Sequence, residues 1–113
     1  MTDTHGEEPI PLSVSVTAGP HSELTLAIAG EVDHVTVADL SDAFDAALNR
    51  VPATLVVDLG NVEFCDSTGL AQLIRLNGLC HVVGIDLQVK PSPAVRKLVT
   101  IAGLDELLPL VNA

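Results

Sequence analysis

The sequence predicts a single α/β domain in which a mixed β-sheet carries helices packed mainly on one face. Segments with the two-residue period of a strand alternate with segments that have the three-to-four-residue period of a helix, in the order β-β-α-β-α-β-α followed by a short edge strand. The 113 residues suit one domain, and the 48% of them that are hydrophobic supply a sizeable core. We therefore expect a flexible N-terminal tail over residues 1–11 and one domain over residues 12–113.

The charge balance argues against a nucleic-acid partner. Fifteen acidic residues against five basic ones give a formal net charge of −10, which repels phosphate backbones and anionic membranes. We expect no direct DNA or RNA binding and no membrane insertion. The acidic surface serves either solubility or the docking of a basic protein, and composition leaves both readings open.

The start of the chain and its cysteines indicate a cytoplasmic protein. The N-terminal residues are polar and acidic where a signal peptide would be basic and then apolar, and no apolar run is long enough to span a bilayer. Cys65 and Cys80 are too few for a disulfide scaffold, so both are expected to be free thiols.

The first two elements are predicted to pair as a hairpin. Residues 12–17 place Leu12, Val14 and Val16 on one face and hydroxyl side chains on the other, which is the period of a half-exposed strand. Residues 23–30 alternate in the same way, and the intervening "AGPHS" reads as a turn.

A helix and a central strand are predicted next. The buried face of the helix is expected to consist of Val37, Leu40, Phe44, Ala47 and Leu48. This helix should end before Pro52. Residues 53–59, "ATLVVDL", are short and nearly all apolar, which is typical of a central strand covered on both faces.

Two further helices and another strand complete the pattern. The second helix is expected to bury Leu70, Leu73, Ile74 and Asn77, and the third Val95, Leu98, Val99 and Ala102. Between them, residues 85–90 alternate as a strand. Ser92 is the predicted N-cap of the third helix, with Pro93 at its first position and Gly103 as its stop. The closing "LDELLPLV" fits a short turn and an edge strand.

The stretch "FCDSTGLAQLIRL", residues 64–76, is the candidate functional site. Asp66 is placed to cap the second helix, and Ser67 and Thr68 occupy its first positions, where backbone donors are unpaired and the helix dipole is positive. These residues either cap the helix only or form a target for phosphorylation. Position favours a site, because loops at the carboxyl ends of parallel strands usually hold one.

Catalysis and cofactor binding find little support in the sequence. No GxSxG motif surrounds Ser67, and the four histidines show no metal-ligand spacing. The glycines form neither a Walker loop nor GxGxxG. We therefore expect no enzyme activity, no metal and no cofactor. Cys65 has two readings, a redox sensor or a packing residue whose thiol pKa is raised by its apolar and acidic neighbours.

The motifs together resemble the STAS domain of bacterial anti-sigma factor antagonists. The resemblance is carried by "GEVD" at 30–33, "LVVDLGNVEFCDSTGL" at 55–70 and "PSPAVRKLVTIAGLDELL" at 91–108, and it extends over nearly the whole chain from about residue 12. It implies a STAS-like single domain. Relatives usually continue into a final helix beyond the position of Ala113, so we expect either an open edge there or a trimmed chain.

The resemblance also implies a partner switch. In that family the unphosphorylated antagonist binds an anti-sigma factor, which is also a serine kinase, and so releases a sigma factor. By this likeness Ser67 is the phosphorylated residue, and Asp33, Asp66, Ser67, Thr68 and Gly69 form the partner-binding surface. A metal-dependent serine phosphatase would reset the switch. The alternative is an accessory subunit of a membrane lipid transporter, because STAS domains occur there too.

Overall fold

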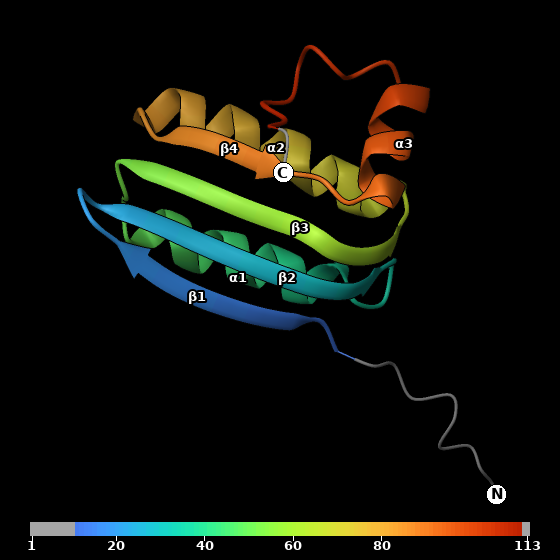
Figure 1. The fold of residues 1–113 in the computed structure, drawn as a ribbon, viewed down its shortest axis with the longest axis horizontal. Coiled ribbons are helices and arrows are strands. Elements are labelled where there is room, and N and C mark those ends of the chain that lie inside the picture. Colours follow the sequence, from blue (N-terminus) through green and yellow to red (C-terminus); the bar gives the residue numbers. More distant parts are fainter. Residues whose placement is uncertain (1–10, 112–113) are drawn as a thin grey trace, which may run out of the picture.

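The computed structural model describes residues 11–111, so residues 1–10 of the predicted tail lie outside the described residues, as do residues 112 and 113. Four strands and three helices follow one another along the chain (Figure 1). They are β1 (Ser13–Gly19), β2 (Glu23–Val32), α1 (Val37–Asn49), β3 (Thr54–Cys65), α2 (Ser67–Val83), β4 (Asp86–Lys90) and α3 (Pro93–Ile101).

The strands form one mixed sheet in the order β1-β2-β3-β4. The predicted hairpin is confirmed, because β1 pairs antiparallel with β2 in a continuous register from Ser13↔Ala29 to Gly19↔Glu23. β3 pairs in parallel with both β2 and β4, so it is central as predicted. Parallel pairing requires a crossover between the strands, and α1 and α2 provide the two crossovers.

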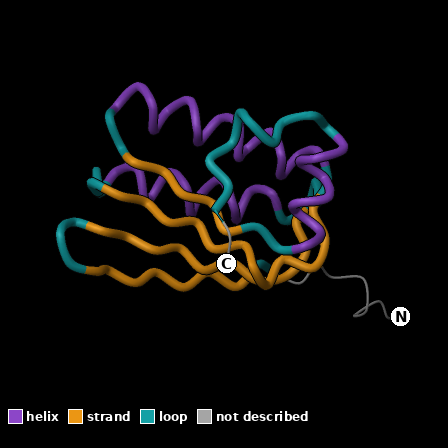
Figure 2. Tube along the Cα trace, turned by 45° about the horizontal axis from the view of Figure 1, so that its top comes forward, coloured by secondary structure: helices purple, strands orange, loops and turns teal. Residues whose placement is uncertain are grey.

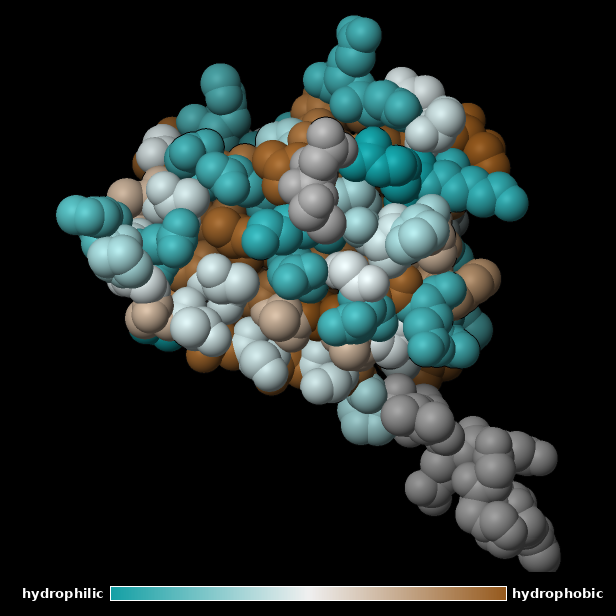
Figure 3. Space-filling model, in the orientation of Figure 1, coloured by the Kyte–Doolittle hydropathy of each residue, from teal (hydrophilic) through white to brown (hydrophobic). Residues whose placement is uncertain are grey.

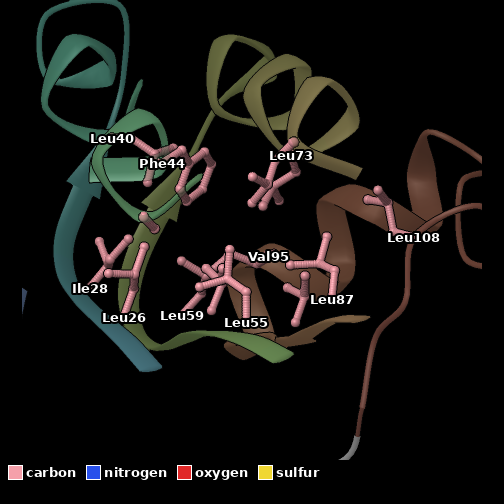
Figure 4. Packing of buried hydrophobic residues seen from close by; sticks show 14 of the residues in the cluster. Leu26, Ile28, Leu40, Phe44, Leu55, Leu59, Leu73, Leu87, Val95 and Leu108 are labelled. Atoms are coloured by element: carbon pink, nitrogen blue, oxygen red, sulfur yellow. The ribbon is translucent and has the colours of Figure 1, made fainter. Parts of the chain in front are cut away.

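The core lies between the sheet and the helices that cover one of its faces, which confirms the predicted layering (Figure 2). Phe44 of α1 and Leu73 of α2 point toward aliphatic side chains of the sheet such as Leu26, Ile28 and Leu55 (Figure 4). Phe44 is fully buried and is one of only two aromatic side chains in the sequence. Aliphatic packing therefore supplies nearly all of the hydrophobic stabilisation.

The opposite face of the sheet carries no helix layer among residues 11–111, and teal and pale residues cover most of it (Figure 3). Helices therefore cover β3 on one face only, as the predicted layering requires. Leu55 and Val57 belong to the core cluster, whereas Val56, between them, is buried outside it. A continuous apolar run does not by itself distinguish a strand between two helix layers from one under a single layer. β3 also continues past Leu59 to Cys65.

The buried faces of α2 and α3 differ from the predicted ones at three positions. Ile74 is 39% exposed, and Asn77 is half-buried with its amide donating to the carbonyl of Leu107. α2 instead buries Gly69, Leu70, Leu73, Leu76 and Cys80. Because α2 is apolar on several sides, hydrophobic period alone selects its buried face poorly. In α3 the last residue of the predicted stripe, Ala102, lies beyond the helix end and is exposed.

The predicted punctuation of α3 is confirmed. Ser92 caps the helix by accepting a hydrogen bond from the backbone N–H of Val95 at 3.1 Å, and Pro93 is the first helical residue. Gly103 follows the end of the helix with a left-handed φ of 75°, which only glycine adopts without strain. The closing segment makes a turn and then a single bridge between Leu110 and Val89, rather than the predicted edge strand.

Replacing Phe44 by Ala tests the dependence on this core. The side chain is 0% exposed, so we expect the free energy of unfolding to fall by about 3–5 kcal/mol through lost burial and the cavity that remains. Urea titration measures the loss. Val82→Ala is the matched control, because Val82 is 80% exposed and its truncation is expected to cost less than about 0.5 kcal/mol. Equal losses in the two variants would contradict this description of the core.

Candidate functional site

The candidate site lies where β2 and β3 end side by side. Val32, the last residue of β2, is in register with Cys65, the last residue of β3. The backbone N–H of Asp66 donates to the carbonyl of Val32 at 3.0 Å, which ties the start of α2 to the end of β2. Asp33 follows Val32 directly, so the structure brings the Asp33 turn and the Asp66 cap together, as parallel strands require.

Asp66 is the N-cap of α2, as the sequence predicted. Its backbone is extended, with φ −102° and ψ −172°, and its Oδ1 atom accepts the N–H of Thr68 at 2.9 Å. The Thr68 hydroxyl donates to the same oxygen. Two donors thus converge on one carboxylate oxygen, which satisfies one of the unpaired backbone groups of the first helical turn.

Ser67 is the first residue of α2 and its side chain is exposed. Within residues 11–111 the Ser67 hydroxyl makes no hydrogen bond, in contrast to its neighbour Thr68. The position is at the positive end of the helix dipole, which favours negative charge. The hydroxyl is therefore accessible and its modification would break no bond of the fold.

Asp33 organises the turn between β2 and α1. Its Oδ1 atom accepts the N–H groups of Val35 and Thr36 at 2.9 and 3.0 Å, and these two hydrogen bonds, that of Thr36 first, hold the pKa of the carboxyl below its ordinary value. The Thr36 hydroxyl, which is buried, donates to the carbonyl of Glu31 at 2.7 Å. Asp33 therefore has a structural role in the turn in addition to its place at the site.

Gly69 is buried and allows the first turn of α2 to approach the end of β2. A Cβ atom at this position would lie 2.6 Å from the Sγ atom of Cys65 and 2.7 Å from a methyl carbon of Val32. Both distances are far shorter than a carbon atom tolerates. The glycine of the motif thus shapes the site by close packing.

Cys65 is half-buried behind this turn. Burial raises the pKa of its thiol to about 11, and the negative charge of Asp66 adds to the rise. Cys80 is buried in the core and its thiol pKa is also raised by burial. A thiol with such a pKa is a poor nucleophile at neutral pH, which favours the packing role of Cys65 over the redox one.

Two exposed apolar side chains at this edge were missed by the sequence analysis. Val35, in the Asp33 turn, and Phe64, the next-to-last residue of β3, are each 49% exposed. Phe64 pairs in register with Glu31 of β2. Their exposure depends on how the strand ends meet, which hydrophobic period does not predict; the available sequence signal is that each lies next to a polar motif.

The described residues provide no metal centre and no membrane span. Among residues 11–111, histidine, cysteine and carboxylate side chains do not gather in the groups of three that a metal ion needs. Within the same range, none of the helices combines the length and hydropathy that a bilayer crossing requires. The edge where β2 and β3 end therefore presents the exposed Ser67 hydroxyl and two exposed apolar side chains, Val35 and Phe64.

The fold and the site together define a small α/β domain with an exposed serine at a helix start. Comparison with protein families agrees, because a family described as "Mlab, STAS domain" matches residues 15–111. The chain therefore belongs to the STAS-domain family, in the group that includes anti-sigma factor antagonists.

Individual relatives bear anti-sigma names. The chain is 41% identical to the anti-sigma-F factor antagonist RsfB of Mycobacterium tuberculosis over 106 residues, which cover 90% of this chain and 84% of RsfB. A crystal structure of an anti-sigma factor antagonist from Mycobacterium paratuberculosis matches with a TM-score of 0.75 and 31% identity, over 88% of this chain and 84% of that one. Unphosphorylated SpoIIAA matches with a TM-score of 0.71 and 20% identity, over 89% and 88% of the two chains, which shows the shared fold.

Substitution of Gly69 by Ala tests the close packing at the site. Because the new methyl group would collide with Val32 and Cys65, we expect the free energy of unfolding to fall by about 1–3 kcal/mol. Gly78→Ala is the control in the same helix. Nothing lies within 4 Å of its Cβ position, so the better helix propensity of Ala should stabilise the domain by about 0.5–1 kcal/mol. Two changes of the same sign would contradict the packing role of Gly69.

The reactivity of Cys65 tests its buried environment. With a pKa of about 11, the folded chain at pH 8 should contain roughly two hundred times less Cys65 thiolate than an ordinary cysteine, and alkylation should be slower in proportion. Peptide-resolved mass spectrometry follows the rate, with the denatured chain as reference. Asp66→Asn keeps a capping side chain but removes the charge, so it should speed the reaction. Equal rates in folded and denatured chains would refute the assignment.

Proposed function

We propose that this protein is an anti-sigma factor antagonist that binds its anti-sigma factor when Ser67 is unphosphorylated and releases it when Ser67 is phosphorylated. The observation that carries the proposal is the exposed Ser67 hydroxyl, which has no hydrogen-bond partner within residues 11–111 and begins the helix that follows the central strand. Names of relatives such as RsfB support the partner class.

The docking surface in this proposal is the edge where β2 and β3 end. Val35, in the turn after β2, and Phe64, near the end of β3, provide exposed apolar area, and Asp66 and Ser67 follow β3 at the same edge of the sheet. Burial of aromatic and aliphatic side chains at the centre of an interface supplies much of the binding energy. Asp33, Thr68 and Gly69 contribute by holding this surface in shape rather than by chemistry of their own.

A phosphate at Ser67 acts on the interface more than on the fold. It adds a charge of about −1.5 to −2 and three acceptor oxygens to a spot that the partner covers. The helix dipole favours this charge by about 0.3–1 kcal/mol. Desolvation and repulsion beneath a partner cost more, and a loss of about 3 kcal/mol already weakens binding more than a hundredfold.

The proposed cycle needs two further proteins. The anti-sigma factor acts as the serine kinase that transfers the phosphoryl group from ATP to Ser67, and a metal-dependent serine phosphatase hydrolyses the phosphoserine. In this cycle the chain is the substrate, and none of its own residues is assigned a catalytic role.

The alternative function is an accessory subunit of a membrane lipid transporter. It is retained because the matching family description reads "Mlab, STAS domain" and because STAS domains also serve in such transporters. A subunit of this kind would bind its transporter ATPase regardless of the state of Ser67. The two functions are therefore separated by whether binding depends on this residue.

The central experiment measures binding of the purified anti-sigma factor kinase from the same genome to wild type, Ser67→Ala and Ser67→Glu. We expect Ser67→Ala to bind like wild type and Ser67→Glu to bind at least about a hundredfold more weakly, because the added carboxylate stands in for the phosphate charge. Incubation with Mg-ATP should phosphorylate wild type but not Ser67→Ala.

Ala53→Glu is the control for added charge. Ala53 is exposed and precedes β3, at the end of the strand opposite Ser67, so this variant should bind like wild type. Equal binding of Ser67→Ala and Ser67→Glu would disprove the switch. In a pull-down from the lysate of the source organism with the same two variants as bait, equal capture of a transporter ATPase by both would instead support the alternative function.

A further inference from the structure

The outer edge of β1 is open within residues 11–111. β1 pairs only with β2, and all of its residues except Gly19 are exposed. The other edge of the sheet is covered at one residue, because the backbone of Val89 in β4 exchanges hydrogen bonds with Pro109 and Val111 of the closing segment. An edge strand with unpaired N–H and C=O groups is a template for pairing with another strand.

β1 lacks the features that usually prevent such pairing. Its sequence, SVSVTAG, contains no charged residue and no proline, and its register with β2 is unbroken by a bulge. Val14 and Val16 are 37% and 51% exposed, although they lie on the core side of the sheet. They line an apolar groove of about 340 Å³ between β1 and α1, together with Leu24 and Leu26.

The strand sequence is complementary to itself in an antiparallel arrangement. If two copies of β1 pair around Ser15, Val14 of each copy lies opposite Val16 of the other, and Ser13 lies opposite Thr17. Residues directly opposite in antiparallel strands share a face of the sheet. The valines therefore all fall on the core side and the hydroxyls all on the open side, in continuation of β2.

The charges along the groove are complementary in the same arrangement. Asp39 and Asp42 lie toward the start of β1, since the Asp39 carboxylate accepts the backbone N–H of Leu12 at 3.4 Å. Arg50 lies toward the end of β1, where it also lines a hollow with Gly19. A twofold axis through Ser15 reverses the partner, so the acidic end of each groove faces the Arg50 end of the other.

The spacing allows these side chains to meet. α1 packs against β2, so the two α1 helices of such a pair lie about three strand spacings apart, or roughly 14 Å. That separation is too wide for direct helix packing. The space between the two α1 helices can hold the four valines next to the sheet, with the Arg50 side chains of both copies farther from the sheet. The net charge of −10 opposes association elsewhere on the surface, whereas β1 itself is uncharged.

We propose that the protein forms a twofold dimer by antiparallel pairing of β1 with β1 of a second copy, which joins the two sheets into one of eight strands. The pairing buries Val14 and Val16 and places Asp39 and Asp42 of each copy near Arg50 of the other. The Ser67 edge lies on other strands, at the ends of β2 and β3 (Figure 1), so both copies keep this surface exposed.

Sedimentation equilibrium of the full chain, from about 1 µM to about 500 µM, tests the proposal because dimerisation follows mass action. The average mass is expected to rise toward twice that of one chain. Val16→Lys places a charge in the pairing edge and should raise the dissociation constant at least about tenfold. Val82→Lys, which makes the same change at an exposed valine of α2, should leave it unchanged. A chain that stays monomeric throughout, or equal effects of the two variants, would overturn the proposal.

Charge reversal provides a second test that leaves the strand untouched. Arg50→Asp and Asp42→Arg should each weaken the dimer, and the double variant should regain association, because reversal of both ends restores the complementarity. Circular dichroism verifies that all variants fold. A double variant that associates no better than the single ones would overturn the antiparallel arrangement, whatever the effect of Val16→Lys.

Discussion

The close approach between the first turn of α2 and the end of β2 is the constraint on which the site depends. Gly69 lies against Val32 and Cys65, with no room for a side chain, and the N–H of Asp66 is bonded to the carbonyl of Val32. The helix start is thereby fixed relative to two parallel strands at once. Ser67 follows Asp66 on this fixed turn. The packing of Gly69 against Val32 and Cys65 therefore keeps the Ser67 side chain exposed.

Features that depend on neighbours in sequence were predictable. The caps at Asp66 and Ser92 follow from a side chain that meets a backbone N–H two or three residues later, and the β1–β2 hairpin follows from alternation around a short turn. The importance of Ser67 came from the resemblance to a family, since spacing alone left capping and phosphorylation open.

Features that depend on tertiary contacts were not predictable from local pattern. α2 is apolar on several sides, so its period did not reveal that Ile74 is exposed while Leu76 is buried. β3 extends beyond Leu59 through alternating polar residues because β2 pairs with it there, a long-range cause. The exposure of Phe64 likewise depends on where two strand ends meet.

Comparison of the serines at the starts of α2 and α3 explains why a switch at Ser67 need not disturb the fold. Ser92 is 3% exposed and its hydroxyl accepts the N–H of Val95, so a phosphate there would remove a cap and bury a charge. At the start of α2 the capping role belongs to Asp66, which leaves the Ser67 hydroxyl without a bond in the described fold. Separation of the capping residue from the modifiable residue confines the effect of a phosphate to whatever protein covers this edge.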